Sequence, residues 1–95
     1  MSTVNINYKP EKSKEYVWKW IDENLEKMVA KKVPTEDIRL KINKSAESVE
    51  FAGKTIKGLM TFKNGVIDLN IELPLLYRMF GAAIRASILD ILKSI

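Results

Sequence analysis

Glu50, Asp68 and Glu72 are the side chains whose type and spacing come closest to acid–base chemistry. Each alternates with apolar neighbours in a strand-like segment, so we expect all three on one open face of a sheet. General acid–base catalysis usually needs a carboxyl group whose pKa is raised by burial, and these groups should be solvated. The sequence has no cysteine and no histidine, the commonest metal ligands and general bases. We therefore expect no enzyme, and no catalytic, cofactor-binding or metal-ligating residues.

Trp18 and Trp20 flank Lys19, and aromatic faces beside a basic group can stack on nucleotide bases. Both tryptophans fall on the helix side that should meet a sheet, which favours core packing. The open sheet face should carry lysines and acids in alternation and no aromatic residue, unlike the stacking platform of an RNA-binding sheet. A weak nucleic-acid-binding module is therefore the alternative function, and it would use Lys31, Lys32, Lys41, Lys57 and Lys63.

The length and composition indicate one small globular domain. A chain of 95 residues with 46% hydrophobic and 29% charged residues can build one core, so we expect a single domain over residues 1–95. The N-terminal residues do not resemble a secretory signal, and a cytoplasmic protein is expected. The apolar segment 73–95 has about the length of a membrane span, but four charged residues interrupt it, which favours a packed helix over a transmembrane segment.

Two changes of apolar spacing predict the elements at the ends of the chain. Val4, Ile6 and Tyr8 alternate with polar residues, as in a short, half-buried strand. Helical spacing begins near Ser13 and predicts an amphipathic helix that ends near Lys32. Residues 33–37 form a connector. A second helix is predicted over 74–95, because proline suits a first helical turn and no strong breaker follows.

Two turn signals set the register of the strands between residues 38 and 73. Asn64-Gly65 is the preferred pair for a two-residue hairpin, and Gly53-Lys54 suits another. The first turn predicts the pairs Phe62–Ile67, Met60–Leu69, Gly58–Ile71, Ile56–Leu73, Thr61–Asp68 and Lys57–Glu72. The second predicts Phe51–Ile56, Val49–Gly58 and Glu50–Lys57. A tight turn over residues 44–47 would add Leu40–Phe51 and Lys41–Glu50, completing a charged row of Lys41, Glu50, Lys57 and Glu72.

These elements predict an α+β fold of order β-α-β-β-β-β-α. It comprises an antiparallel four-stranded meander plus a short N-terminal strand, with two helices packed on one face. The outer face is polar apart from Leu59. The inner face is apolar and comprises Leu40, Ile42, Val49, Phe51, Ile56, Met60, Phe62, Ile67, Leu69 and Ile71.

The C-terminal helix has more apolar residues than one sheet can cover. One stripe should face the sheet: Leu76, Phe80, Ala83, Ile84, Ile88, Ile91 and Ile95. A second set could pack against the first helix or form an interaction surface, since an uncovered apolar flank usually meets another molecule. The predicted interaction surface comprises Leu75, Arg78, Met79, Ala82, Arg85, Ala86, Leu89 and Leu92.

The segments "VNINYKP", "ENLEKM", "VIDLNIELPLLYRMF" and "IRASILDIL" occur in an order that resembles the putative polyhydroxyalkanoic acid system protein family. The resemblance implies a non-enzymatic role linked to polyester granules or to the proteins that coat them. We thus predict an interaction protein that forms a homodimer or docks to a protein or granule surface through the C-terminal helix. A ligand pocket near Met28, Met60 or Met79 is a third interpretation.

Overall fold

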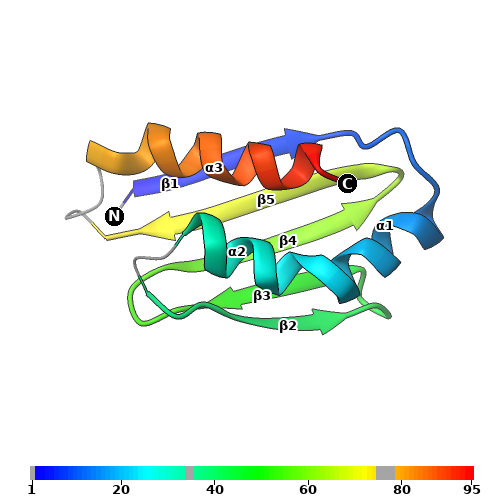
Figure 1. Ribbon diagram of the computed structural model, residues 1–95, viewed down its shortest axis with the longest axis horizontal. Coiled ribbons are helices and arrows are strands. Elements are labelled where there is room, and N and C mark those ends of the chain that lie inside the picture. Colours follow the sequence, from blue (N-terminus) through cyan, green and yellow to red (C-terminus); the bar gives the residue numbers. More distant parts are fainter. Residues whose placement is uncertain (1, 34–35, 75–78) are drawn as a thin grey trace.

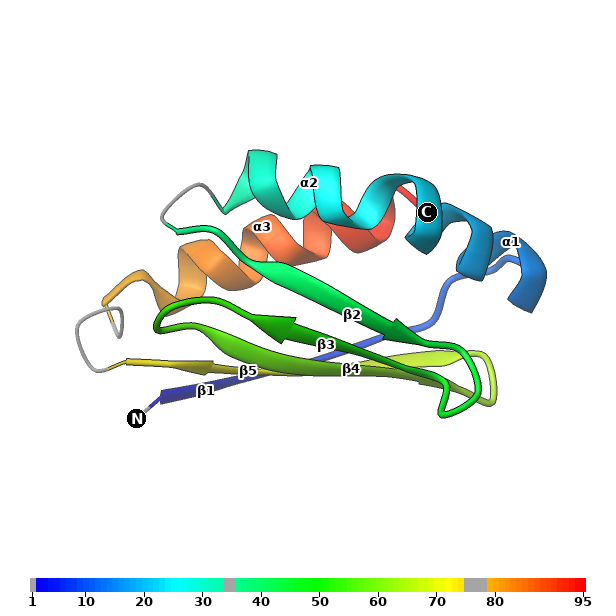
Figure 2. The same ribbon diagram turned by 90° about the horizontal axis from the view of Figure 1, so that it is seen from below.

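The computed structural model describes residues 2–33, 36–74 and 79–95, which form one antiparallel sheet with helices on one face (Figures 1 and 2). The strands are β1 (Ser2–Tyr8), β2 (Arg39–Asn43), β3 (Ser48–Ala52), β4 (Lys57–Lys63) and β5 (Val66–Leu73), and the helical segments are α1 (Lys14–Trp20), η1 (Ile21–Leu25), α2 (Glu26–Lys32) and α3 (Gly81–Lys93). The strand order is β1-β5-β4-β3-β2. The α+β class and element order are confirmed. The sheet has five strands, because β1 pairs with β5 along all seven of its residues.

The β4–β5 hairpin is confirmed in turn and register. Asn64 and Gly65 have φ values of 54° and 75°, which suit asparagine and glycine. Phe62 lies opposite Ile67 and Lys57 opposite Glu72. The local sequence therefore determines this hairpin by itself.

The predicted register of the β3–β4 hairpin is wrong by two residues. Phe51 pairs with Gly58 and Glu50 pairs with Leu59, so a longer loop joins the strands. The loop closes through a hydrogen bond of 2.8 Å from the Gly53 N–H to the Ile56 carbonyl. A shift of two residues keeps every side chain on its predicted face. It does break the predicted charged row, because Leu59 takes the place opposite Glu50.

Glu36, in the connector after α2, explains the longer loop. Its carboxylate accepts hydrogen bonds from Thr55 N–H (2.9 Å), Ile56 N–H (2.7 Å) and Thr55 Oγ1 (2.6 Å). A Cβ atom on Gly53 would collide with Oε1 of Glu36, so any larger residue at that position would displace this carboxylate from its place in the loop. Burial alone would raise the pKa of Glu36, but these hydrogen bonds and the Lys54 charge outweigh it and hold that pKa below its ordinary value.

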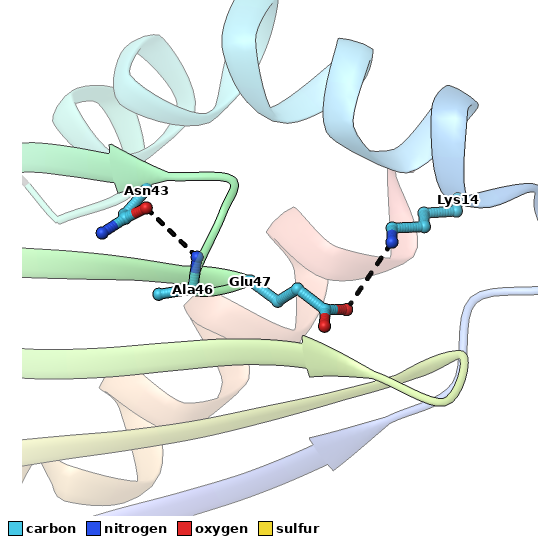
Figure 3. A network of polar contacts seen from close by, with 4 residues as sticks. All are labelled: Lys14, Asn43, Ala46 and Glu47. Atoms are coloured by element: carbon cyan, nitrogen blue, oxygen red, sulfur yellow. Dashed lines mark hydrogen bonds and ion pairs between the residues drawn. The ribbon is translucent and has the colours of Figure 1, made fainter.

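The β2–β3 turn joins the far end of the sheet to the first helix (Figure 3). Asn43 Oδ1 accepts a hydrogen bond of 3.1 Å from the Ala46 N–H, and Glu47 adopts a positive φ of 53°. The Glu47 carboxylate lies 3.8 Å from Lys14 Nζ, at the start of α1. The pairing of Lys41 with Glu50 confirms the register predicted across this turn.

The predicted first helix is confirmed, but its central turn is wider than an α-helical turn. Ser13 caps α1 by accepting a hydrogen bond from the Tyr16 N–H, and α2 ends at Lys32. Between them η1 is a π-helix. The buried residues Val17, Ile21, Leu25 and Val29 recur every four positions. An ideal α-helix would rotate such a series by about 40° at each step, and the wider turn reduces that drift.

The core lies between the sheet and the helices, as predicted. The inner-face residues of the sheet are buried or half-buried, and Trp18 is 7% exposed. Its ring packs against Phe62 at a centroid distance of 6.2 Å. Trp20 is half-buried against the same core. Both tryptophans therefore serve packing, which removes them as a platform for base stacking.

Candidate interaction surface

α3 is held by two neighbours, because it contacts both β1 and α2. Ile88, Ile91 and Leu92 are buried, and Ile84, Leu89 and Ile95 pack against the core as half-buried residues. The apolar surplus of the sequence is thus divided between a sheet contact and a helix contact.

Several sequence-based placements along this helix need correction. The helix was predicted to begin at Pro74, but α3 begins at Gly81, and Pro74 lies outside any helix. Leu92 was assigned to the interaction surface and is only 1% exposed, because it lies on the buried side of α3 together with Ile88 and Ile91. Phe80 was assigned to the sheet-facing stripe and is 55% exposed, since it precedes the α-helix. Leu75, Leu76 and Arg78 lie outside the described residues.

An exposed apolar area remains at the start of α3. Met79 is 86% exposed, the largest exposure among the large apolar side chains of the described residues. We use the name α3 surface for five exposed residues: Met79, Phe80, Ala82, Ala83 and Ala86. Arg85 is exposed within the same segment. Phe80 and Ala83 belong to this surface although the sequence reasoning placed them on the sheet.

The chemistry available on the α3 surface is apolar contact. Methionine is flexible and polarisable, and it adapts to partners of different shape. The small side chains of Ala82, Ala83 and Ala86 let another surface approach the helix backbone closely. Such an area suits docking and offers no group for proton transfer or nucleophilic attack.

The outer face of the sheet does not assemble the carboxylates into a catalytic pair. Glu50 lies opposite Lys41, Glu72 lies opposite Lys57, and Asp68 Oδ1 accepts a hydrogen bond of 3.1 Å from Asn5 Nδ2. Asn5 Nδ2 also donates to Asn70 Oδ1 (2.6 Å), and Asn7 Nδ2 donates to Asn5 Oδ1 (3.1 Å). We call Asn5, Asn7, Asp68 and Asn70 the amide cluster.

The lysines of the nucleic-acid alternative do not form one patch. Lys41 and Lys57 each lie opposite a carboxylate, whereas Lys31 and Lys32 close α2 on the opposite side of the sheet. No aromatic side chain lies on the outer face among the described strand residues. The outer face formed by the described strands therefore lacks both the continuous basic groove and the stacking platform of single-strand binders.

A narrow apolar pocket of about 20 Å³ lies between the helices and the sheet. That volume accommodates little more than one water molecule, whereas small-molecule sites usually measure about 300–1,000 Å³. None of Met28, Met60 and Met79, the methionines of the third interpretation, lines it. The lining residues are Val29, Val33, Ile38, Phe51, Ile56, Leu69, Ile71, Ile84 and Ile88.

Two further features concern metal binding and membrane insertion. Within residues 2–33, 36–74 and 79–95, no three acidic side chains gather closely enough to hold a metal ion. None of the described helices has the length and apolar content needed to cross a bilayer.

Comparison with known proteins identifies the family. The family model described as putative polyhydroxyalkanoic acid system protein matches residues 5–95. The chain belongs to this family. No curated protein and no solved structure is a significant match to it. The family description refers to a polyhydroxyalkanoic acid system and names no enzymatic activity.

Proposed function

We propose that this protein is a non-enzymatic interaction protein of a polyhydroxyalkanoic acid system, acting in the cytoplasm. Its α3 surface docks to an apolar partner, which is either a coat protein of the storage granule or the polyester itself. Arg85 is the charged residue at the edge of this docking area.

The observation that supports this proposal most is the exposure of Met79 and Phe80 at 86% and 55%. Large apolar side chains that remain exposed beside a run of small residues are typical of binding surfaces. The family description supports an apolar partner, because polyhydroxyalkanoic acids are polyesters whose surfaces are largely apolar.

Binding to polyhydroxyalkanoate particles tests the proposal. The protein is mixed with particles, and the bound fraction is measured by sedimentation over a range of protein concentrations. Burial of a methionine side chain contributes about 1.5–3 kcal/mol, so Met79→Glu should weaken binding by about tenfold or more. Because Met79 is largely exposed, the substitution should leave the fold intact.

Leu59→Glu is the matched control. Leu59 is also an exposed large apolar residue, at 44%, but it lies on the outer face of the sheet, away from the helices. This variant should bind the particles like the wild type. Absence of wild-type binding would contradict docking to the polyester, and equal loss of binding in both variants would contradict the role of the α3 surface.

A further inference from the structure

The two edges of the sheet differ in how well they are protected. β1 forms one edge, and its sequence STVNINY contains no charged residue and no proline. Its seven residues pair one-to-one with β5, without a bulge. An edge strand exposes a row of backbone N–H and C=O groups that can pair with another strand. The β1 edge therefore has the properties of a pairing surface.

The opposite edge carries the features that prevent such pairing. β2 has only five residues, and Arg39 and Lys41 are exposed along it. Charged side chains and short length are the usual protection of edge strands. If the sheet is extended by another strand, the β1 edge is the favoured side.

The helix layer is also open on the β1 side. α3 runs in the same direction as β1, with α2 on one side of it and the free edge of β1 on the other (Figures 1 and 2). Given a right-handed helix with Ile88 and Ile91 toward the core, Ala82 and Leu89 lie on the side away from α2. Ala82 is exposed and Leu89 is half-buried. Arg85 lies between these two residues on the same side of the helix and is exposed. This side of α3 can therefore receive a second surface through apolar contacts that surround one charged side chain.

We infer that two copies of this chain pair through their β1 edges, antiparallel, around a two-fold axis at Asn5. The inference deepens the proposed interaction function, on which it rests, by naming a second copy as a partner. Full overlap of the seven β1 residues places Asn5 opposite the same residue of the other copy and Val4 opposite Ile6. The result is one sheet with five strands from each copy.

The symmetry of this pairing also joins the helix layers. An antiparallel edge contact is self-complementary, as a two-fold interface requires. Because the axis is perpendicular to the sheet, both α3 helices remain on the same face and lie on either side of the axis. Their sides that carry Ala82 and Leu89 then face each other. On the outer face, the amide clusters of the two copies meet at Asn5.

A single-cysteine cross-link tests this geometry, since the natural sequence contains no cysteine. Cβ atoms of directly opposed residues in an antiparallel pair lie about 4.5–5.5 Å apart, close to the separation in a disulfide. Oxidised Asn5→Cys should therefore give mainly a disulfide-linked dimer. Asn70→Cys is the control, because Asn70 belongs to the same amide cluster but lies one strand inward. It should remain largely unlinked.

Sedimentation of the unmodified protein provides the second measurement. A dimer is expected at micromolar concentration, whereas a monomer at up to about 1 mM would overturn the inference. Equal cross-linking of Asn5→Cys and Asn70→Cys would also overturn it. A monomer that still binds polyester particles through Met79 would contradict only the pairing. A dimer that binds no particles would contradict docking to the polyester and leave the pairing intact.

Discussion

Two hairpin turns in one sheet reach their register by different means. The Asn64-Gly65 turn has its signal in its own two residues, which tolerate positive φ. The loop from Gly53 to Ile56 depends on Glu36, whose carboxylate receives two backbone N–H groups and one hydroxyl. A turn stabilised by a distant side chain can be longer than its own sequence suggests. It also links the stability of two segments far apart in the chain.

The largest expected effect comes from removing that side chain. Glu36→Ala deletes three hydrogen bonds and leaves the partly buried Ile56 N–H without its acceptor. We expect the free energy of unfolding to fall by about 2 kcal/mol. Asp37→Ala removes the neighbouring exposed carboxylate and should change it by less than about 0.5 kcal/mol. Urea unfolding of both variants measures the difference, and similar values for both would contradict the role of Glu36.

The stabilisation by Glu36 should also depend on pH. Because the pKa of Glu36 is lower in the folded than in the unfolded state, the folded state binds its proton more weakly. The stabilisation is complete above the ordinary pKa of 4.5 and decreases as the pH falls through the lower folded value. Glu36→Gln cannot titrate, so its stability deficit relative to the wild type should shrink in acid. Urea unfolding between about pH 7 and pH 3 measures this gap. A constant gap would contradict the prediction.

A smaller loss of stability is expected from alanine at Gly53 or Gly65, and only the loss at Gly53 should depend on Glu36. Gly53→Ala brings a Cβ against Glu36 Oε1, whereas Gly65→Ala meets no atom within 4 Å and only strains a φ of 75°. Each should destabilise by about 1–2 kcal/mol. In a Glu36→Ala background the effect of Gly53→Ala should decrease, while that of Gly65→Ala should not change. Thermal or urea unfolding of the wild type, the two single variants and the double variant measures this coupling for each glycine. If the free-energy changes of Gly53→Ala and Glu36→Ala simply add, the contact between Gly53 and Glu36 is contradicted.

The same contrast explains how much of the fold the sequence predicts. Alternation in β1, the helical spacing that begins near Ser13 and the Asn64-Gly65 turn are local signals, and the elements they predict are confirmed. The register of β3 against β4 was wrong because the preference of Gly53-Lys54 for a two-residue loop competes with hydrogen bonds to Glu36. A glutamate at the end of a connector carries no local signal for such a contact. The sheet face predicted for each side chain was nevertheless correct, since a shift of two residues preserves the alternation of side chains along a strand.

For the residues assigned to the interaction surface, exposure was predicted only in part, for a different physical reason. Met79, Ala82, Arg85 and Ala86 are exposed, whereas Leu92 is in the core. A helical wheel gives the apolar residues of a helix but not its rotation or its first residue. Here α3 begins at Gly81 and contacts both β1 and α2, so Phe80 became exposed while Leu92 became buried. The docking role of this surface remains a proposal.

The π-helical turn lets the first helix keep one continuous buried face. Val17, Ile21, Leu25, Val29 and Val33 are all buried and recur every four residues. Removal of one residue from η1, such as the exposed Glu23, would change these intervals to four, three, four and four, the spacing of an ordinary α-helix. The helix is therefore equivalent to an α-helix with one inserted residue. The wider turn accommodates this extra residue without displacing the buried face from the core.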